Sequence, residues 1–353
     1  MTRKFGTADR PRRADRSARP ADSERPLWLF LTEPGLGALL IRELKFLDAI
    51  AQKAQLAKLH LRNYDLMAAP DAVVRSPGAA PRLALHVLAC PIFGRERVSQ
   101  HQLDRLAQIA IREKSSELVK SIAGGSLSKP EFERLVVRGL SERGVRFSVG
   151  TGRPIWLLAV DEKYYFGFPR FNFHDAKGRG RASQREGSLP PVIAAAMVFA
   201  AKPGPREVIW DPVTGAGTIL AEAAVMAPQA KLIGSDLDPS ALAMARNRLP
   251  SHARLMRSDV AHAELDSRDL SLTIANLPFG KKFKSSGGNR ALYETVLRRS
   301  LDYASTEWRA SLLTSDADAL KAAAEAVGGL ALHEVAQITV RGVKAAIWLV
   351  TRQ

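Results

Sequence analysis

The pattern of apolar and polar positions changes near residue 175. From there to the last residue, short apolar runs alternate with segments of helical periodicity, the order typical of a doubly wound parallel sheet. We therefore expect a Rossmann-like α/β domain over 176–353 that ends in a β-hairpin. The expected helices are 191–201, 218–226 and 240–248, and the expected strands are 207–210, 231–235, 272–275, 311–314, 331–339 and 345–350.

Residues 27–175 have a mixed pattern that predicts an α+β domain. A β-type run covers 26–32, and four leucines at helical spacing predict a helix over 36–47. Residues 1–26 mix Arg, Pro, Ser and acids without periodicity, which predicts a disordered basic tail. The remaining expected elements of this half are a helix over 102–123 and strands over 83–89, 136–149 and 155–160.

Charge points to a polyanionic partner. Among 353 residues, Lys and Arg outnumber Asp and Glu by 52 to 36, a formal net charge of +16. Cations that neutralise phosphates release counterions, so this surplus favours polyanionic partners, although a merely basic surface remains open. The candidate RNA-binding residues lie in two basic stretches, where the alternative is a solvated loop: Lys177, Arg179, Arg181, Arg185, Lys281, Lys282 and Lys284.

Cysteine, histidine and the apolar runs limit the kinds of site and the location that this protein can have. Cys90 is the single cysteine and the seven histidines have no metal-ligand spacing, so no disulfide framework and no metal site are expected. No apolar run approaches the ~20 residues that cross a bilayer, and the first residues lack the apolar core of a secretory signal. We expect a cytoplasmic location without a membrane partner.

A glycine-containing loop, 211–218, lies between an expected strand and an expected helix. Glycines there allow a tight turn and a close approach to a ligand, and the helix start offers free N–H groups. Leu220 replaces the next glycine of a dinucleotide fingerprint, and an acid opens the loop, so NAD is disfavoured. A ligand with an ammonium and a sulfonium suits that acid. The candidate cofactor-binding residues of the loop are Asp211, Thr214, Gly215, Gly217 and Thr218.

Two further acids follow the next strands. Asp236 ends the second strand, 21 positions after Gly215, where it can bind both ribose hydroxyls of an adenosine. Asp259 follows a short third strand and is placed to accept a hydrogen bond from an adenine amine. With the loop, these acids predict S-adenosylmethionine as the cofactor; the alternative is that the Gly-x-Gly is only a turn.

The segment Asn276-Leu277-Pro278-Phe279-Gly280 follows the fourth strand, at the edge where ligands bind. The side-chain oxygen of Asn276 and the carbonyl of Leu277 can each accept an N–H from an amine on an aromatic base. Pro278 would stiffen the segment and Phe279 could stack on the base. These four residues are the candidate catalytic residues, and Asn276 is also counted as cofactor-binding. The alternative is a turn with a core phenylalanine.

These residues resemble a known family. Ser188–Met197, Asp211–Glu222, Ser235–Asp238 and the Asn276 segment are similar to the catalytic domain of THUMP-containing RNA guanine methyltransferases. The resemblance covers 187–301. It implies S-adenosylmethionine-dependent methylation of a guanine 2-amino group, in transfer RNA or, as in relatives, ribosomal RNA. Residues 29–37 with Glu43 are similar to the ferredoxin-like opening piece of these enzymes, which implies a THUMP-like RNA-recruiting domain over 27–175.

The expected function is therefore an RNA methyltransferase that acts on guanosine in transfer RNA. Three alternatives stay open: a ribosomal-RNA guanine methyltransferase, an adenine-amine methyltransferase acting on DNA or RNA, and a non-catalytic RNA-binding protein with a relic fold. The choice of guanine over adenine rests on the resemblance, because the pocket chemistry of the Asn276 segment suits either amine.

Overall fold

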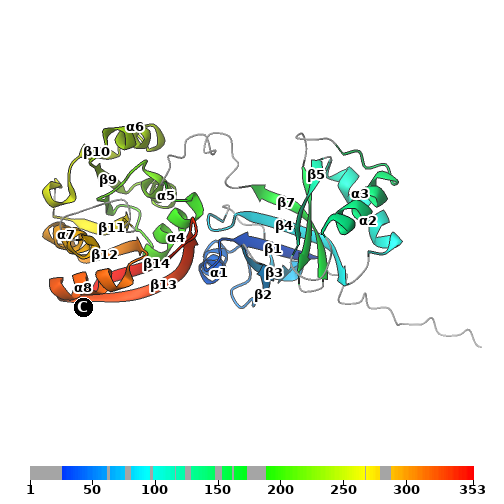
Figure 1. Ribbon diagram of the computed structural model, residues 1–353, viewed down its shortest axis with the longest axis horizontal. Coiled ribbons are helices and arrows are strands. Elements are labelled where there is room, and N and C mark those ends of the chain that lie inside the picture. Colours follow the sequence, from blue (N-terminus) through cyan, green and yellow to red (C-terminus); the bar gives the residue numbers. More distant parts are fainter. Residues whose placement is uncertain are drawn as a thin grey trace, which may run out of the picture.

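The computed structural model describes residues 26–61, 64–75, 81–95, 98–115, 117–123, 129–147, 153–160, 163–172, 188–266, 268–278 and 288–353. These residues form two lobes, each built on a seven-stranded sheet (Figure 1). The first sheet ends at Asn172 and the second lobe begins with the helix at Pro191. The expected tail lies outside the described residues apart from Pro26, and so does the expected domain boundary at 175 and 176.

The N-terminal lobe is an α+β layer with one continuous sheet in the order β2-β3-β1-β4-β7-β6-β5. Neighbouring strands are antiparallel, except that β5 and β6 are parallel. Its elements are β1 (Leu27–Thr32), α1 (Gly37–Phe46), β2 (Ala57–Leu61), β3 (Tyr64–Pro70), β4 (His86–Arg95), α2 (Gln100–Arg112), β5 (Glu117–Ala123), α3 (Lys129–Ser141), β6 (Pro154–Val160) and β7 (Lys163–Asn172).

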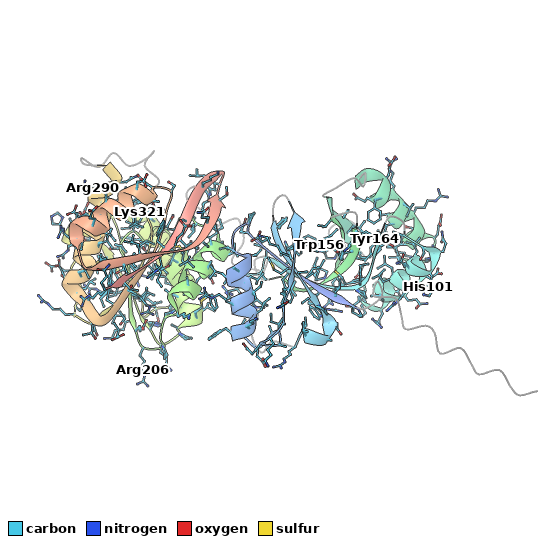
Figure 2. All side chains as sticks on the ribbon, turned by 90° about the horizontal axis from the view of Figure 1, so that it is seen from below. His101, Trp156, Tyr164, Arg206, Arg290 and Lys321 are labelled. Carbon is cyan, nitrogen blue, oxygen red and sulfur yellow. The ribbon has the colours of Figure 1, made fainter. Side chains whose placement is uncertain are left out.

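Both faces of this sheet are buried. Along β6, Ile155 and Leu157 lie in the apolar cluster beneath α2 and α3, whereas Trp156 and Leu158 lie in a cluster on the opposite face. Tyr164 belongs to the first cluster, and Figure 2 labels it together with Trp156. Strand β2 also contacts β6, so the sheet curves round the face that carries no helix. The alternation of side chains along a strand explains why β6 is almost wholly apolar.

Two predictions in this lobe were wrong. The helix expected over 102–123 ends at Arg112, because Lys114 adopts a left-handed conformation with φ of 52°, and β5 follows. In place of the strand expected over 136–149, residues 136–141 form the end of α3, where Val136 and Leu140 are four positions apart and fully buried on one helical face. The adjacent valines at 136 and 137 favoured a strand, but the four-residue spacing decided the structure.

The C-terminal lobe is a three-layer α/β sandwich with strand order β10-β9-β8-β11-β12-β14-β13. Strands β8 to β12 are parallel, and β13 and β14 form the expected antiparallel hairpin. One apolar cluster includes α4, α5 and α6, and the other includes α7 and α8. The elements are α4 (Pro191–Ala201), β8 (Val208–Asp211), α5 (Thr218–Met226), β9 (Lys231–Asp236), α6 (Pro239–Arg248), β10 (Arg254–Arg257), β11 (Leu270–Asn276), α7 (Gly288–Tyr303), β12 (Ala304–Thr314), α8 (Ala317–Val327), β13 (Leu330–Val340) and β14 (Val343–Arg352).

The two lobes are joined through α1, which packs against α4 within one continuous apolar cluster (Figure 1). Gly35, just before α1, approaches the hairpin so closely that a Cβ there would lie 1.8 Å from the Gln337 carbonyl oxygen. Polar contacts reinforce the junction. The carboxylate of Glu43 accepts the backbone N–H groups of Arg82 and Leu83 at 2.7 and 2.9 Å, and the Arg82 guanidinium binds both carboxylate oxygens of Glu222 on α5.

Replacement of Arg82 should weaken this junction strongly. The side chain of Glu222 is only 6% exposed, so Arg82→Met leaves a buried carboxylate without its partner. We expect a loss of about 3–5 kcal/mol in the free energy of unfolding, measured by denaturant titration. The matched control is Arg75→Met, since the Arg75–Asp48 pair has side chains 55% and 61% exposed and should contribute no more than about 1 kcal/mol. Equal losses in the two variants would contradict this account.

Candidate active site

The candidate site lies at the carboxyl edge of the parallel strands in the C-terminal lobe. Strand β8 pairs with β9 on one side and with β11 on the other, so the chain reverses its direction of winding there. Open α/β sheets bind ligands at such a switch point, outside the carboxyl ends of the strands. Asp211, Asp236 and Asn276 are the last residues of β8, β9 and β11. The fold therefore brings together the three chain segments that the sequence singled out.

Asp211 is a buried carboxyl group at the start of the glycine loop. Its Oδ1 accepts the backbone N–H of Val213 at 3.1 Å, and its Oδ2 has no hydrogen-bond partner among the described residues. Burial raises the pKa of Asp211 to about 8; the N–H of Val213 opposes this rise, and the negative charge of Asp236 adds to it. A buried carboxyl with a free oxygen is poised to receive a cationic group.

The glycine loop itself leaves room for a ligand. A Cβ added to Gly215 would meet no atom within 4 Å, whereas one added to Gly217 would lie 3.0 Å from Ala245 on α6. Gly215 therefore faces open space, and Gly217 permits close packing of α5 against α6. The Thr214 hydroxyl is buried and lies close to the Asp211 carboxyl, whose pKa it lowers. The open side of the loop is available to a ligand.

Asp236 connects the glycine loop to the next one. Its Oδ2 accepts the N–H of Gly215 at 2.8 Å and its Oδ1 accepts the N–H of Asp238 at 2.9 Å. Between them, Leu237 is an apolar side chain that is 61% exposed. Leu237 was not among the predicted site residues, although an apolar residue between two acids is a signal in the sequence. It offers an apolar contact for a purine ring beside the acid expected to bind ribose.

Two predicted cofactor residues already have structural partners. The Thr218 hydroxyl accepts the Arg248 guanidinium at 2.6 Å, which joins the start of α5 to the end of α6. Asp259 is exposed and accepts the N–H of Ala261 at 2.9 Å, capping the short 3-10 helix Val260–His262. The exposed carboxylate of Asp259, after the end of β10, can accept a further hydrogen bond from a ligand. The Thr218 hydroxyl is less available to a ligand because it already binds Arg248. Both roles stay predictions.

The Asn276 segment presents two acceptors that accept no hydrogen bond from the described residues. The Oδ1 of Asn276 is buried and has no hydrogen-bond partner among the described residues. Leu277 has a buried side chain, and its N–H donates to the Leu313 carbonyl on β12 at 2.9 Å, while its own carbonyl accepts none of the hydrogen bonds formed in the described part of the chain. A buried oxygen without a donor costs free energy, so this end of β11 is suited to an incoming N–H group.

A second group of residues behind this segment was missed by the sequence analysis. The Tyr293 hydroxyl on α7 donates to the Pro278 carbonyl at 2.9 Å and lies 2.8 Å from the Thr314 hydroxyl at the end of β12. The sequence does not indicate that Tyr293 contacts Pro278, 15 positions earlier. The contact exists only once α7 has formed and packed on the sheet.

The other predicted site residues lie outside the described residues. They are Phe279, Lys281, Lys282 and Lys284, and the basic residues Lys177, Arg179, Arg181 and Arg185. Within the described part of the chain, no group of three or more His, Cys, Asp or Glu side chains is placed to hold a metal ion. None of the helices described there is both long and apolar enough to span a membrane.

Comparison with known proteins identifies the class of the C-terminal lobe. Residues 179–344 match the family model described as RMKL-like, methyltransferase domain. This part of the chain, 166 of 353 residues, is therefore similar to the methyltransferase domain of that family. S-adenosylmethionine, the cofactor predicted from the sequence, is the methyl donor of such a domain.

Curated relatives agree with the predicted resemblance, which is confirmed. The chain is 31% identical over 195 residues to a tRNA (guanine(6)-N2)-methyltransferase of Thermus thermophilus, covering 53% of this chain and 58% of that one. It is 35% identical over 109 residues to the U6 snRNA (guanine-N(2))-methyltransferase THUMPD2 of Bos taurus, covering 30% of this chain and 22% of that one. The chain therefore matches less than two thirds of the length of either relative.

Solved structures confirm the predicted fold class. The crystal structure of TrmN from Thermus thermophilus superposes with a TM-score of 0.76 at 26% identity, over 93% of this chain and 100% of that one. A putative methyltransferase, SMU.472, complexed with SAH superposes with a TM-score of 0.66 at 14% identity, over 93% and 99% of the two chains, and so shares the fold.

The residues at the switch point fit S-adenosylmethionine. The free oxygen of Asp211 can receive the ammonium group, the open face of Gly215 admits the ligand, and Asp236 with Leu237 can hold the ribose and adenine. An acid in the loop and the absence of a third glycine suit this cation better than a pyrophosphate. The buried Thr214 hydroxyl supplies a further polar contact.

Cofactor binding should depend on pH through Asp211. With its pKa raised to about 8, Asp211 holds a proton at pH 7, and a cation beside it favours ionisation. Binding should therefore release a proton, and affinity should rise by up to about tenfold per pH unit as the pH increases toward 8. Titration calorimetry between pH 6 and 8, in buffers with different ionisation enthalpies, measures both quantities.

The control for this prediction is Asp211→Asn. It removes the carboxyl but retains the titration of the ligand's own amine, so the difference between the two proteins isolates Asp211. Identical proton release and identical pH dependence in wild type and variant would show that Asp211 does not receive the cation.

Proposed function

We propose that this protein is an S-adenosylmethionine-dependent RNA methyltransferase that methylates the exocyclic 2-amino group of a guanosine in transfer RNA. The observation that carries the proposal is the buried Oδ1 of Asn276, which has no hydrogen-bond partner among the described residues. It lies one residue from the Leu277 carbonyl and beside the cofactor loop. Two acceptors at the end of one strand suit the two N–H bonds of a primary amine.

The two acceptors compensate for the low nucleophilicity of an exocyclic amine. The lone pair of an amine on a purine is delocalised into the ring. When Asn276 and Leu277 each accept one N–H, the nitrogen can turn its lone pair toward the cofactor loop. S-adenosylmethionine supplies an electrophilic methyl group when bound. Orientation of this kind contributes much of the rate, and no strong base is needed if the proton leaves after the methyl group has been transferred.

The choice of substrate rests on relatives and charge. The names of the curated relatives include guanine N2 methylation of tRNA and of U6 snRNA, and the net charge of +16 favours a nucleic acid. We propose that residues 27–175 form the THUMP-like domain that recruits the RNA. The base must leave its stack, since its amine is otherwise inaccessible. A cytoplasmic location is part of the same proposal.

Substitution of Asn276 should separate catalysis from cofactor binding. In Asn276→Ala the amine loses one of its two acceptors, so we expect kcat to fall by about a hundredfold, as when one oriented polar group is lost from other active sites. The Kd for S-adenosylmethionine should change by less than about threefold, because the loop of β8 and the acid of β9 are intact. Calorimetry and a methyl-transfer assay on RNA give the two quantities.

A matched control is Asn247→Ala, which removes an exposed amide on α6, away from the Asn276 segment. This variant should retain wild-type kcat. Full activity of Asn276→Ala would overturn the proposed role of the segment. Failure of the wild type to bind S-adenosylmethionine would instead favour a non-catalytic RNA-binding protein.

A further inference from the structure

The carbonyl of Pro278 is held from behind by a buried tyrosine. Tyr293 is fully buried on α7, and its hydroxyl lies 2.9 Å from the Pro278 carbonyl oxygen and 2.8 Å from the Thr314 hydroxyl. Thr314 is also buried, and its oxygen accepts the N–H of Asp316 at 2.9 Å. Three elements, α7, β12 and the start of α8, therefore converge on the residue two positions after Asn276.

The direction of every proton in this group is determined. A carbonyl can only accept, so the single proton of the Tyr293 hydroxyl is donated to Pro278. The contact between the two hydroxyls must then be a donation from Thr314 to Tyr293. The Thr314 hydroxyl oxygen in turn accepts a hydrogen bond from the N–H of Asp316. Burial raises the pKa of Tyr293, which keeps the phenol protonated for its role as donor.

Two anchors consequently bracket the Leu277 carbonyl. On one side the N–H of Leu277 is bound to the Leu313 carbonyl at 2.9 Å. On the other side the carbonyl of Pro278 is bound to Tyr293. The ring of Pro278 fixes its φ angle near −65°, so little torsional freedom remains between the two anchors. The peptide that carries the Leu277 carbonyl cannot turn without breaking one of these hydrogen bonds.

We propose that Tyr293 is a positioning residue for methyl transfer: through the Pro278 carbonyl, its hydroxyl fixes the direction of the Leu277 carbonyl that accepts the target amine. Thr314 fixes the orientation of the Tyr293 hydroxyl. This inference rests on the proposed function of the Asn276 segment. Neither residue touches the substrate, so their effect is on the orientation of the amine and not on cofactor binding.

The test is Tyr293→Phe, which removes only the hydroxyl. We expect kcat for RNA methylation to fall by about 10- to 100-fold, as expected for a small misplacement of reacting groups. The KM for RNA and the Kd for S-adenosylmethionine should stay within about threefold of wild type, since no binding contact is removed. Thr314→Val should lower kcat in the same way, whereas Thr314→Ser, which retains the hydroxyl, should restore it.

The structural control is Ser300→Ala on the same helix. Ser300 is fully buried, and its hydroxyl contacts the Thr273 hydroxyl at 2.9 Å and donates to the Val296 carbonyl, remote from Pro278. Its loss should lower the Tm to a similar extent without lowering kcat. If Tyr293→Phe retains wild-type kcat, or if Ser300→Ala loses as much kcat at equal Tm loss, the positioning role is overturned. An inactive wild type would instead overturn the proposed function.

Discussion

The pair of hydrogen bonds from Gly215 and Asp238 to the carboxylate of Asp236 holds the cofactor side of the site together. One side chain at the end of β9 orders both the glycine loop after β8 and the turn into α6. It leaves the face of Gly215 open and Leu237 exposed, and the neighbouring Asp211 has an oxygen that is paired with no N–H group of the described residues. The parallel pairing of β8 and β9 makes this contact possible, because it brings both strand ends to one edge.

On the other side of β8, the substrate side of the site is likewise ordered by hydrogen bonds at the ends of neighbouring parallel strands. Strand β11 ends at Asn276 beside the end of β12, and the hydrogen bonds of Leu277 and Pro278 extend this order beyond the last sheet residue. The N-terminal lobe is fixed to this framework, since Arg82 binds Glu222 on the helix that follows the glycine loop. A substrate held by that lobe would therefore meet a site of fixed orientation.

The sequence was most informative where local pattern and final structure coincide. In the C-terminal lobe, β8 and β9 are short, largely apolar runs that are each followed by a helix, and the expected bounds of α4 and α5 match those observed. In the N-terminal lobe, the predictions over α3 and β5 were wrong, because the adjacent valines at 136 and 137 favoured a strand and the left-handed conformation of Lys114 has no clear signal in the sequence. The Tyr293–Thr314 contact could not be predicted, since it depends on the packing of α7 against the sheet.

The central claim is that the carboxyl edge of this sheet orients a guanine 2-amino group for methyl transfer. Incubation of the full chain with total RNA and methyl-labelled S-adenosylmethionine, followed by digestion and mass spectrometry of the nucleosides, tests it most directly. The account predicts that the label appears in N2-methylguanosine of the transfer-RNA fraction. Label confined to N6-methyladenosine, or the absence of labelled nucleoside from an enzyme that binds the cofactor, would contradict it.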